Sequence, residues 1–313
     1  MNVGLDIMGG DFAPKASLDG VAQSLPLLGN DVMLTLFGHE PTITRYFEQH
    51  NLPTNQVTIV GTTQVVEMGE SPTKAIMKKP ESSISVGMKY LGESKIDAYI
   101  SAGNTGAVLV ASMYLVKVIE GVIRPAISSL LPRMNGSYGI LLDVGANPDS
   151  KPDVLYQFGV LGSLYAKHVL NIPNPKVGLL NIGEEKEKGN LATQAAYDIF
   201  ENSSRINFTG NVEGYDIFSD KVDVIACDGF VGNVVLKSSE ALFRTMKEFV
   251  QDEEMQKRLD YQYYGGTPIL GVRKPVLIGH GVSSPLAFQS MIQQAIEMVK
   301  SDLIEKVKTT FEP

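Results

Sequence analysis

Short runs rich in β-branched residues alternate with helical patterns along this chain. The runs typical of strands cover residues 2–7, 32–38, 56–60, 97–101, 138–144, 176–182, 206–210 and 223–227. Parallel strands need long crossover connections, so this alternation predicts a parallel or mixed sheet that is covered by helices on both faces. The predicted fold class is therefore α/β.

The helical patterns carry apolar stripes that need a core. One stripe consists of Val235, Ser239, Leu242, Met246 and Phe249. Its spacing is that of one helix face, so we expect it to be buried. Residues 285–307 predict a long closing helix. The most apolar stretch, 106–123, contains Lys117 and Glu120 and is too short to span a membrane, which favours a buried helix.

Composition narrows the class of protein. At 313 residues with 43% hydrophobic content, the chain is large enough for two lobes. No linker divides it, so we expect residues 1–313 to form one functional unit of two lobes, interleaved in sequence, around a cleft. A net charge of -8 argues against a nucleic-acid surface. A single cysteine, no zinc-ligand spacing and no N-terminal secretory signal predict a cytoplasmic protein.

Glycine-rich polar loops follow the predicted strands. They include residues 8–14, 101–107, 142–152, 181–190 and 227–233. In an open α/β sheet, loops after the carboxyl ends of strands converge on one crevice. Glycines allow close backbone approach, and a helix N-terminus presents free N–H groups. The recurrence favours a site for phosphate or another anion. For residues 227–233 alone, a tight turn with Asn233 as helix N-cap is the alternative.

Motifs for common nucleotide and nucleophile sites are missing from the sequence. It contains no G-x-G-x-x-G before the first helix, no G-x-x-x-x-G-K-[ST] and no G-x-S-x-G. His280 with Ser283 and Ser284 is more typical of a polar cap than of a base with its nucleophile. Cys227 ends an apolar run, which favours a buried thiol over a catalytic thiolate.

The loops instead offer residues for electrostatic and positional catalysis. Lys188 can neutralise a phosphate or an oxyanion, and Thr105 starts an expected helix. The neutral donors are Asn104, Asn147, Asn190 and Asn233. Capping or a left-handed turn is the alternative for one or two of them. The carboxylates are Asp11, Asp143 and Asp228. Each is either a loop orienter or an acid–base group, and the sequence leaves both roles open.

Ordered motifs along nearly the whole chain carry a resemblance to a known family. They are "GLDIMGGDFAP", "SAGNTGA", "LDVGAN", "LLNIGEEKEKGN", "GNVEGYDI", "CDGFVGNVVLK" and "YGGTPILGV". With these motifs the chain resembles the bacterial phosphate acyltransferases, which make acyl-phosphate from acyl-[acyl carrier protein] and orthophosphate for phospholipid synthesis. The resemblance implies a three-layer α/β/α sandwich with a mostly parallel sheet, similar to isocitrate and isopropylmalate dehydrogenases and phosphotransacetylase. It also implies a homodimer.

The reaction implied by the resemblance suits these loops. Phosphate is already an anionic nucleophile, so we expect no covalent intermediate, no metal and no organic cofactor. The enzyme must hold phosphate near a thioester carbonyl and stabilise the oxyanion that forms. Carried over to this chain, the catalytic residues are Lys188, Asn233 and Asp228. The phosphate- and substrate-binding residues are Asn104, Thr105, Asp143, Asn147, Asn190, Gly229 and Gly232.

The implied partners are the acidic acyl carrier protein and a membrane glycerol-3-phosphate acyltransferase that consumes acyl-phosphate. A chain of net charge -8 needs a local basic patch to bind an acidic carrier. The expected patch is Lys257, Arg258, Arg273 and Lys274. The family's apolar-basic hairpin before "YGG" is short and acidic here, so at most weak peripheral contact with the inner face of the membrane is expected.

Three other functions stay open from the sequence. A phosphotransacetylase would perform the same chemistry on acyl-coenzyme A. A dehydrogenase of the related fold is disfavoured, because metal-binding aspartates with substrate-binding arginines are not evident. A non-catalytic scaffold would bind carrier protein and recruit the next acyltransferase.

Overall fold

The chain divides into two compact units, each assembled from separate segments. The computed structural model describes residues 1–133, 135–246 and 249–312. Unit 1 contains Met1–Val118 and Tyr261–Lys300, and unit 2 contains Ile119–Asp260 and Ser301–Pro313.

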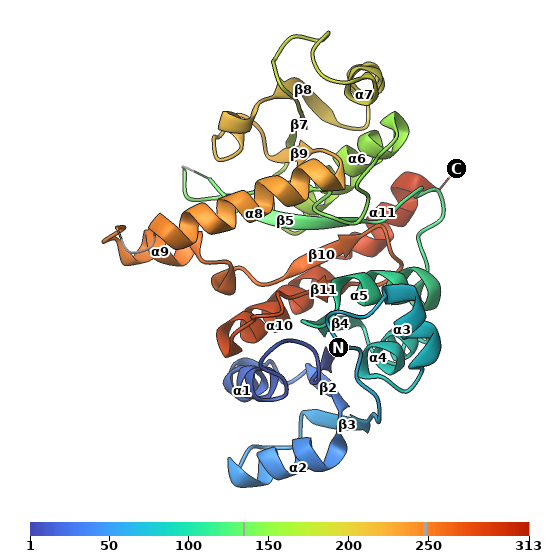
Figure 1. Cartoon of the computed structure of the whole chain (residues 1–313), viewed down its shortest axis with the longest axis vertical. Coiled ribbons are helices and arrows are strands. Elements are labelled where there is room, and N and C mark those ends of the chain that lie inside the picture. The colour runs from blue at the N-terminus through green and yellow to red at the C-terminus, as the bar shows by residue number, and fades with distance from the viewer. Residues whose placement is uncertain (134, 247–248, 313) are drawn as a thin grey trace. The chain divides into compact units, whose positions relative to one another are not determined.

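A mostly parallel group of strands forms the centre of unit 1 (Figure 1). These strands are β1 (Asn2–Asp6), β2 (Met33–Gly38), β3 (Val57–Gly61), β4 (Ala98–Ser101), β10 (Thr267–Leu270) and β11 (Val276–Ile278). They lie in the order β3-β2-β1-β4-β11-β10, and β10 is antiparallel to β11. The other neighbours are parallel, so their carboxyl ends lie at one edge.

Helices cover both sides of these strands. They are α1 (Lys15–Ser24), α2 (Glu40–Gln49), α3 (Pro72–Lys78), α4 (Ser83–Gly92), α5 (Thr105–Ala111) and α10 (Pro285–Lys300), with 3-10 turns η1 (Leu25–Leu27) and η4 (Tyr261–Tyr263) and the π-helical turn η2 (Ser112–Val116). Figure 1 shows α1 and α10 side by side on one side and α3, α4 and α5 on the other. The packing is close: a Cβ on Gly87 of α4 would lie 2.0 Å from the ring of Tyr99.

Unit 2 repeats this plan. Its strands are β5 (Ala126–Pro132), β6 (Tyr138–Leu142), β7 (Lys176–Leu180), β8 (Asn207–Val212) and β9 (Val224–Ala226). Their order is β5-β6-β9-β7-β8, with β5 antiparallel to β6 and the other pairs parallel. The helices are α6 (Pro152–His168), α7 (Leu191–Glu201), α8 (Gly229–Met246), α9 (Glu253–Leu259) and α11 (Leu303–Phe311), with the 3-10 turn η3 (Gly214–Asp216). Figure 1 shows α6 and α8 on opposite sides of the strands.

The predicted α/β class and α/β/α sandwich with mostly parallel strands are confirmed. Each run predicted as a strand overlaps an observed strand. Strands β5, β10 and β11 were not predicted from the sequence. The first is interrupted by serines and ends at Pro132, and the other two are only four and three residues long. Such short runs carry too little pattern to be recognised.

Three helix predictions need correction. The helix predicted over 106–123 stops after η2, because Lys117 adopts φ +77. The closing helix predicted over 285–307 is two helices, separated at Asp302 with φ +52.

The apolar stripe predicted to be buried on α8 is also wrong in part. The buried face of α8 is formed by Gly229, Gly232, Leu236 and Ser239. Leu242 and Met246 are 52% and 43% exposed, and Phe249 lies beyond the end of the helix. Two small glycines bring the first turns of α8 close to the strands, which explains why a different face is buried.

Candidate functional site

Three loops of unit 2 begin at the same level of the sheet. β9 lies between β6 and β7, and Ala226 is in register with Leu142 on one side and Leu179 on the other. All three strands are parallel, so residues 143–147, 181–190 and 227–233 start from one edge. This edge is the usual ligand side of an α/β sheet. It carries most of the residues predicted for the site.

Asp143 organises the loop after β6. Its side chain is fully buried and accepts hydrogen bonds from the Ile127 N–H at 2.9 Å and the Asn147 N–H at 2.6 Å. The Asn147 amide donates to the same carboxylate at 2.9 Å and to the Pro125 carbonyl at 2.8 Å. Burial raises the pKa of Asp143, while these hydrogen bonds oppose the rise. The contacts support the loop-orienting alternative for Asp143, and they engage the Asn147 side chain within the same part of unit 2.

The two predicted glycines press α8 against this loop. The Gly229 N–H donates to the Asn147 carbonyl at 2.7 Å, and a Cβ on Gly229 would lie 2.8 Å from the Asp143 carboxylate. A Cβ on Gly232 would lie 1.9 Å from the Asp143 carbonyl oxygen. Any side chain at either position would therefore push α8 away from β6.

Asp228 caps α8, and Asn233 does not. The Asp228 carboxylate accepts the Val231 N–H, in the first turn of α8, at 2.9 Å. The helix begins at Gly229, so the alternative of Asn233 as N-cap is wrong. The Val231 N–H is thus engaged by the protein's own carboxylate, and the contact supports the orienting role of Asp228.

Asn233 sits in the first turns of α8 with an exposed side chain. A Cβ on Gly145 would lie 3.7 Å from the Asn233 side chain, and Gly145 itself has φ +120. Among the residues that the structure describes, no hydrogen bond involves the side-chain carboxamide of Asn233. It is therefore able to donate to a ligand at the strand-end edge.

Lys188 is an exposed cation in the loop after β7. Nearby Lys186 pairs with Asp198 at 3.0 Å and with Glu201 at 2.5 Å, and Lys221 pairs with Asp216 at 2.9 Å. Within the described part of the chain, Lys188 has no ion pair. Its aliphatic carbons lie over Gly183, where a Cβ would meet them at 2.8 Å. The ammonium is thus available for an anion.

The remaining predicted donors divide into two kinds. Asn104, only 5% exposed, caps α5 by accepting the Ala107 N–H at 3.0 Å. Its amide donates to the carbonyls of Glu67, Met68 and Glu70. Both polar groups of Asn104 are therefore used by unit 1, which supports the capping alternative over phosphate binding.

Asn190 is the second capping asparagine, and its amide group is still available. Its side-chain oxygen accepts the Thr193 N–H at 2.9 Å at the start of α7. Among the described residues, no partner receives the Asn190 amide N–H groups. Capping thus holds for Asn104 and Asn190, and Thr105 begins α5 as predicted.

The disfavoured nucleophiles gain no support from the structure. Cys227 is buried, and burial raises the pKa of its thiol. Ser283 is 2% exposed. Its backbone N–H donates to the His280 carbonyl at 2.9 Å, and its hydroxyl makes no such contact in the described part of the chain. The Ser284 hydroxyl donates to Gln262.

The residues predicted for carrier docking belong to both units. Lys257 and Arg258 lie on α9 in unit 2, where Arg258 pairs with Glu254 at 2.8 Å. Arg273 and Lys274 lie in unit 1, where the Arg273 Nε donates to the Val118 carbonyl at 3.3 Å. That these residues form one patch stays a prediction.

Unit 1 contains a buried carboxylate that was not predicted from the sequence. Asp6, 1% exposed, ends β1 and accepts the Ser101 hydroxyl at 2.7 Å and the Met8 N–H at 3.0 Å. Burial raises its pKa, while hydrogen bonds, including one from Ser83, oppose the rise. An aspartate inside an apolar strand run just before "MGG" was the signal that could have found it.

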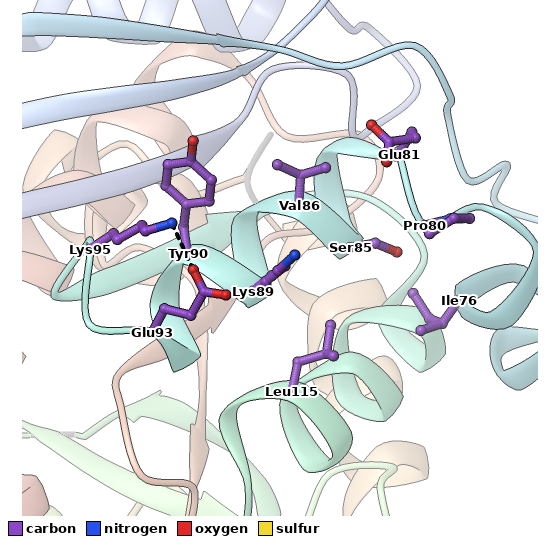
Figure 2. Close-up of a pocket in the computed structure, with 10 residues that line it drawn as sticks. All are labelled: Ile76, Pro80, Glu81, Ser85, Val86, Lys89, Tyr90, Glu93, Lys95 and Leu115. Carbon is purple, nitrogen blue, oxygen red and sulfur yellow. Dashed lines mark ion pairs between the residues drawn. The ribbon is translucent and has the colours of Figure 1, made fainter.

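A pocket of about 360 Å³ lies elsewhere in unit 1 (Figure 2). Residues of α3, α4 and η2 line it, and none of the predicted site residues is among them. Lys95 at its rim pairs with Glu93 at 2.7 Å and lies 4.8 Å above the Tyr90 ring. Its two glutamates and two lysines balance in charge, so the pocket presents no excess positive charge to a phosphate.

Two kinds of feature are missing from the described residues. No helix among them is both long and apolar enough to cross a membrane. In the same residues, no group of three or more histidine, cysteine, aspartate or glutamate side chains is placed to hold a metal ion.

Comparison with known proteins gives one consistent family. A family model described as "Fatty acid synthesis protein" matches residues 1–256 and 252–306. The phosphate acyltransferase of Halothermothrix orenii is 40% identical over 328 residues, which cover 98% of this chain and 98% of that protein. The phosphate acyltransferase of Desulforudis audaxviator is 41% identical over 324 residues, covering 97% and 94% of the two chains.

Solved structures share the fold at much lower identity. A phosphotransacetylase from Streptococcus pyogenes has a TM-score of 0.68 and 14% identity, with 96% of this chain and 94% of that chain covered. The EutD phosphotransacetylase from Staphylococcus aureus has a TM-score of 0.64 and 15% identity, with 95% and 94% covered. A 4-hydroxythreonine-4-phosphate dehydrogenase from Klebsiella pneumoniae has a TM-score of 0.56 and 12% identity, with 95% and 97% covered.

Proposed function

Because the chain belongs to the phosphate acyltransferase family and is an acyltransferase enzyme, we propose that it transfers a fatty acyl group from acyl carrier protein to orthophosphate. The product is an acyl-phosphate for phospholipid synthesis. The observation that carries this proposal is the position of Lys188, which has no ion pair among the described residues. Its loop follows β7, and the neighbouring parallel strand β9 ends at the same edge and leads into α8 with Asn233. A cation and an amide donor at one edge suit an anionic nucleophile.

In the proposed reaction, a phosphate oxygen attacks the thioester carbonyl carbon. The new C–O bond forms, the carbonyl oxygen becomes an oxyanion, and the C–S bond then breaks. The carrier's sulfur leaves as a thiolate and takes up a proton. No oxidant or reductant is needed. Lys188 neutralises phosphate or the oxyanion, and Asn233 and Asn190 donate hydrogen bonds to the same charges.

Other predicted residues would act by holding these groups in place. Asp143, Asn147 and Asp228 fix the loop after β6 and the start of α8. Gly229 and Gly232 let α8 approach that loop. Asn104 and Thr105 order the corresponding turn in unit 1. Such pre-organisation lowers the cost of reorganising donors during the reaction.

We propose acyl carrier protein as the donor because the family resemblance includes it. The partners would be acyl carrier protein, a second copy of this chain and a membrane glycerol-3-phosphate acyltransferase that takes up the acyl-phosphate. The site would lie in the cytoplasm, with at most weak contact at the inner face of the membrane. The relatives are named as enzymes, which disfavours the non-catalytic scaffold.

The competing donor is acyl-coenzyme A, since phosphotransacetylases share the fold. Acyl-phosphate formation from acyl-carrier protein and from acyl-coenzyme A, measured side by side at equal acyl length, separates the two donors. We expect a higher kcat/KM with acyl-carrier protein. A higher kcat/KM with acyl-coenzyme A would make the protein a phosphotransacetylase instead.

A further inference from the structure

Three carboxamide side chains surround the main chain at Lys188. We propose that Asn181, Gln194 and Asn211 are positioning residues that hold this lysine for acyl transfer, an inference that rests on the proposed function. They come from three elements: the end of β7, helix α7 and strand β8. None of them belongs to the catalytic or phosphate-binding groups assigned above.

Gln194 clamps the chain on both sides of the lysine. Its Nε2 donates to the Glu187 carbonyl at 2.6 Å and to the Gly189 carbonyl at 3.2 Å. Asn181 Nδ2 donates to the carbonyl of Lys188 itself at 3.1 Å. Consecutive carbonyls are thereby fixed, so the direction in which the Lys188 side chain leaves the backbone is fixed as well.

Asn211 supports the same loop from β8. Its Nδ2 donates at 2.9 Å to the Glu185 carbonyl, which also accepts the Lys188 N–H at 3.1 Å. Asn211 is 3% exposed, and its own side-chain oxygen is buried without a hydrogen-bond partner in the described structure. A buried unpaired acceptor lowers stability, so an apolar residue would suit the core better. The contact with the Lys188 loop explains why an amide stands there.

The conformation of the loop leaves it little freedom. Gly189 has φ +96, where a side chain is strained. A Cβ there would lie 2.2 Å from the Thr193 hydroxyl and 2.4 Å from Asn181 Oδ1. Gly189, which directly follows Lys188, is thus enclosed by the side chains of Thr193 and Asn181.

Neutral amides suit this task better than charged side chains. An ionised carboxylate at these positions has no N–H to donate to the carbonyls, and it would add negative charge beside a loop that is expected to meet an anionic substrate. The other lysines near this loop, Lys186 and Lys221, are already paired with acids. Carboxamides hold the backbone through hydrogen bonds and leave the Lys188 ammonium free of an ion pair among the described residues.

A double-mutant cycle separates positioning from general support of the fold. The variants are Gln194→Met, which keeps length but removes the donor, and Lys188→Ala, alone and together. Gln56→Met is the matched control, because Gln56 Nε2 donates to two carbonyls, those of Gly29 and Val32, both at 2.9 Å, before the amino end of β3. The readouts are kcat, the KM for each substrate and the unfolding midpoint in urea.

If Gln194 acts through Lys188, Gln194→Met lowers kcat about tenfold and leaves the KM for the acyl donor unchanged, since small displacements of a catalytic group are costly. In the Lys188→Ala background the same change should alter kcat less than about twofold. Gln56→Met should keep kcat near the wild-type value at a similar loss of stability. Asn211→Leu should repeat the Gln194→Met result with a smaller loss of stability, because it removes a buried unpaired oxygen.

The experiment distinguishes failure of the proposed site from failure of the positioning role. If Lys188→Ala keeps near-normal turnover, the proposed site and the positioning role are both overturned. If Lys188→Ala is strongly impaired but Gln194→Met lowers kcat by the same factor in the wild type and in the Lys188→Ala variant, only the positioning role is overturned.

Discussion

At the scale of residues, the candidate site is distinguished by the polar side chains that the fold leaves without protein partners. In unit 2, Asp143, Asn147 and Asp228 bind the protein's own backbone, whereas Lys188 and Asn233 have no ion pair or hydrogen bond through their side chains among the described residues. Groups already engaged cannot rearrange toward a ligand without losing those contacts. The free groups are therefore the ones that we expect to meet phosphate.

Removing either free group should impair chemistry without unfolding the protein. We expect Lys188→Ala and Asn233→Ala each to lower turnover roughly a hundredfold or more, since losing one oxyanion donor typically costs ~2.7–4 kcal/mol. Steady-state kinetics of purified variants measure this. Lys186→Ala is the control, because that lysine is spent on surface ion pairs and should keep near-normal turnover. If Lys188→Ala and Asn233→Ala keep the near-normal turnover expected of Lys186→Ala, neither residue belongs to the site.

The buried Asp143 should leave a pH signature in stability. Its pKa is raised above the ordinary value of 3.8, so the folded protein binds its proton more tightly than the unfolded chain does. At pH values below the ordinary pKa, this proton contributes fully to the stability of the folded protein. The contribution is lost as pH rises through the raised pKa of the folded state. Relative to Asp143→Asn, the wild type should lose free energy of unfolding across that window and then level off.

Urea unfolding of both proteins from about pH 4 to about pH 8 measures this difference. The substitution also disturbs the N–H groups that bind the carboxylate, but that cost does not vary with pH. Parallel curves for the two proteins across the whole range would show that Asp143 has no raised pKa.

At the scale of elements, the position of α8 depends on its glycines. Gly232→Ala would place a Cβ 1.9 Å from the Asp143 carbonyl oxygen, so α8 must shift and carry Asn233 with it. We expect a loss of about 1–3 kcal/mol in the free energy of unfolding, which is typical of overpacking, and a lower turnover. Gly214→Ala is the control, since nothing lies within 4 Å of a Cβ there. A Gly232→Ala protein with normal stability and turnover would contradict the close packing.

The same elements show how far sequence patterns reach. The alternation of patterns predicted the parallel strands, because buried strands and amphipathic helices differ in period. The buried face of α8 was beyond such reasoning: Leu242 and Met246 follow helical spacing, yet the glycines set which face meets the strands. Lys188 and Asn190 could be found from the glycine-rich loop after β7, and Asn233 from the glycine-rich run that leads into α8. The use of Asn104 to bind three carbonyls far along the chain could not, because those contacts depend on tertiary structure.

At the scale of the whole molecule, net charge bears on the choice of partner. A protein of net charge -8 repels an acidic carrier at long range, but salt screens charges beyond ~8 Å and leaves local complementarity to decide. Lys257 and Arg258 on α9 are candidates for that local contact, although Glu254 already pairs with Arg258. Docking would therefore require exchange of this exposed ion pair, which costs little.

Charge reversal tests this contact. We expect Lys257→Glu with Arg258→Glu to raise the KM for acyl-carrier protein several-fold with little change for acyl-coenzyme A, and to weaken the salt dependence of the carrier reaction. Kinetics with both donors over a range of salt concentrations give the answer. Equal effects on both donors, or no effect on either, would exclude these two residues from docking.

The most direct test of the central claim follows the oxygen atoms of phosphate. In the proposed reaction the attacking phosphate keeps all its oxygens, and one of them forms the new bond to the acyl carbon. Acyl-carrier protein, fully ¹⁸O-labelled orthophosphate and the enzyme are mixed, and the products are analysed by mass spectrometry. We predict an acyl-phosphate that carries every labelled oxygen and depends on Lys188. Release of unlabelled fatty acid without acyl-phosphate would show that water, and not phosphate, receives the acyl group, and would contradict the account.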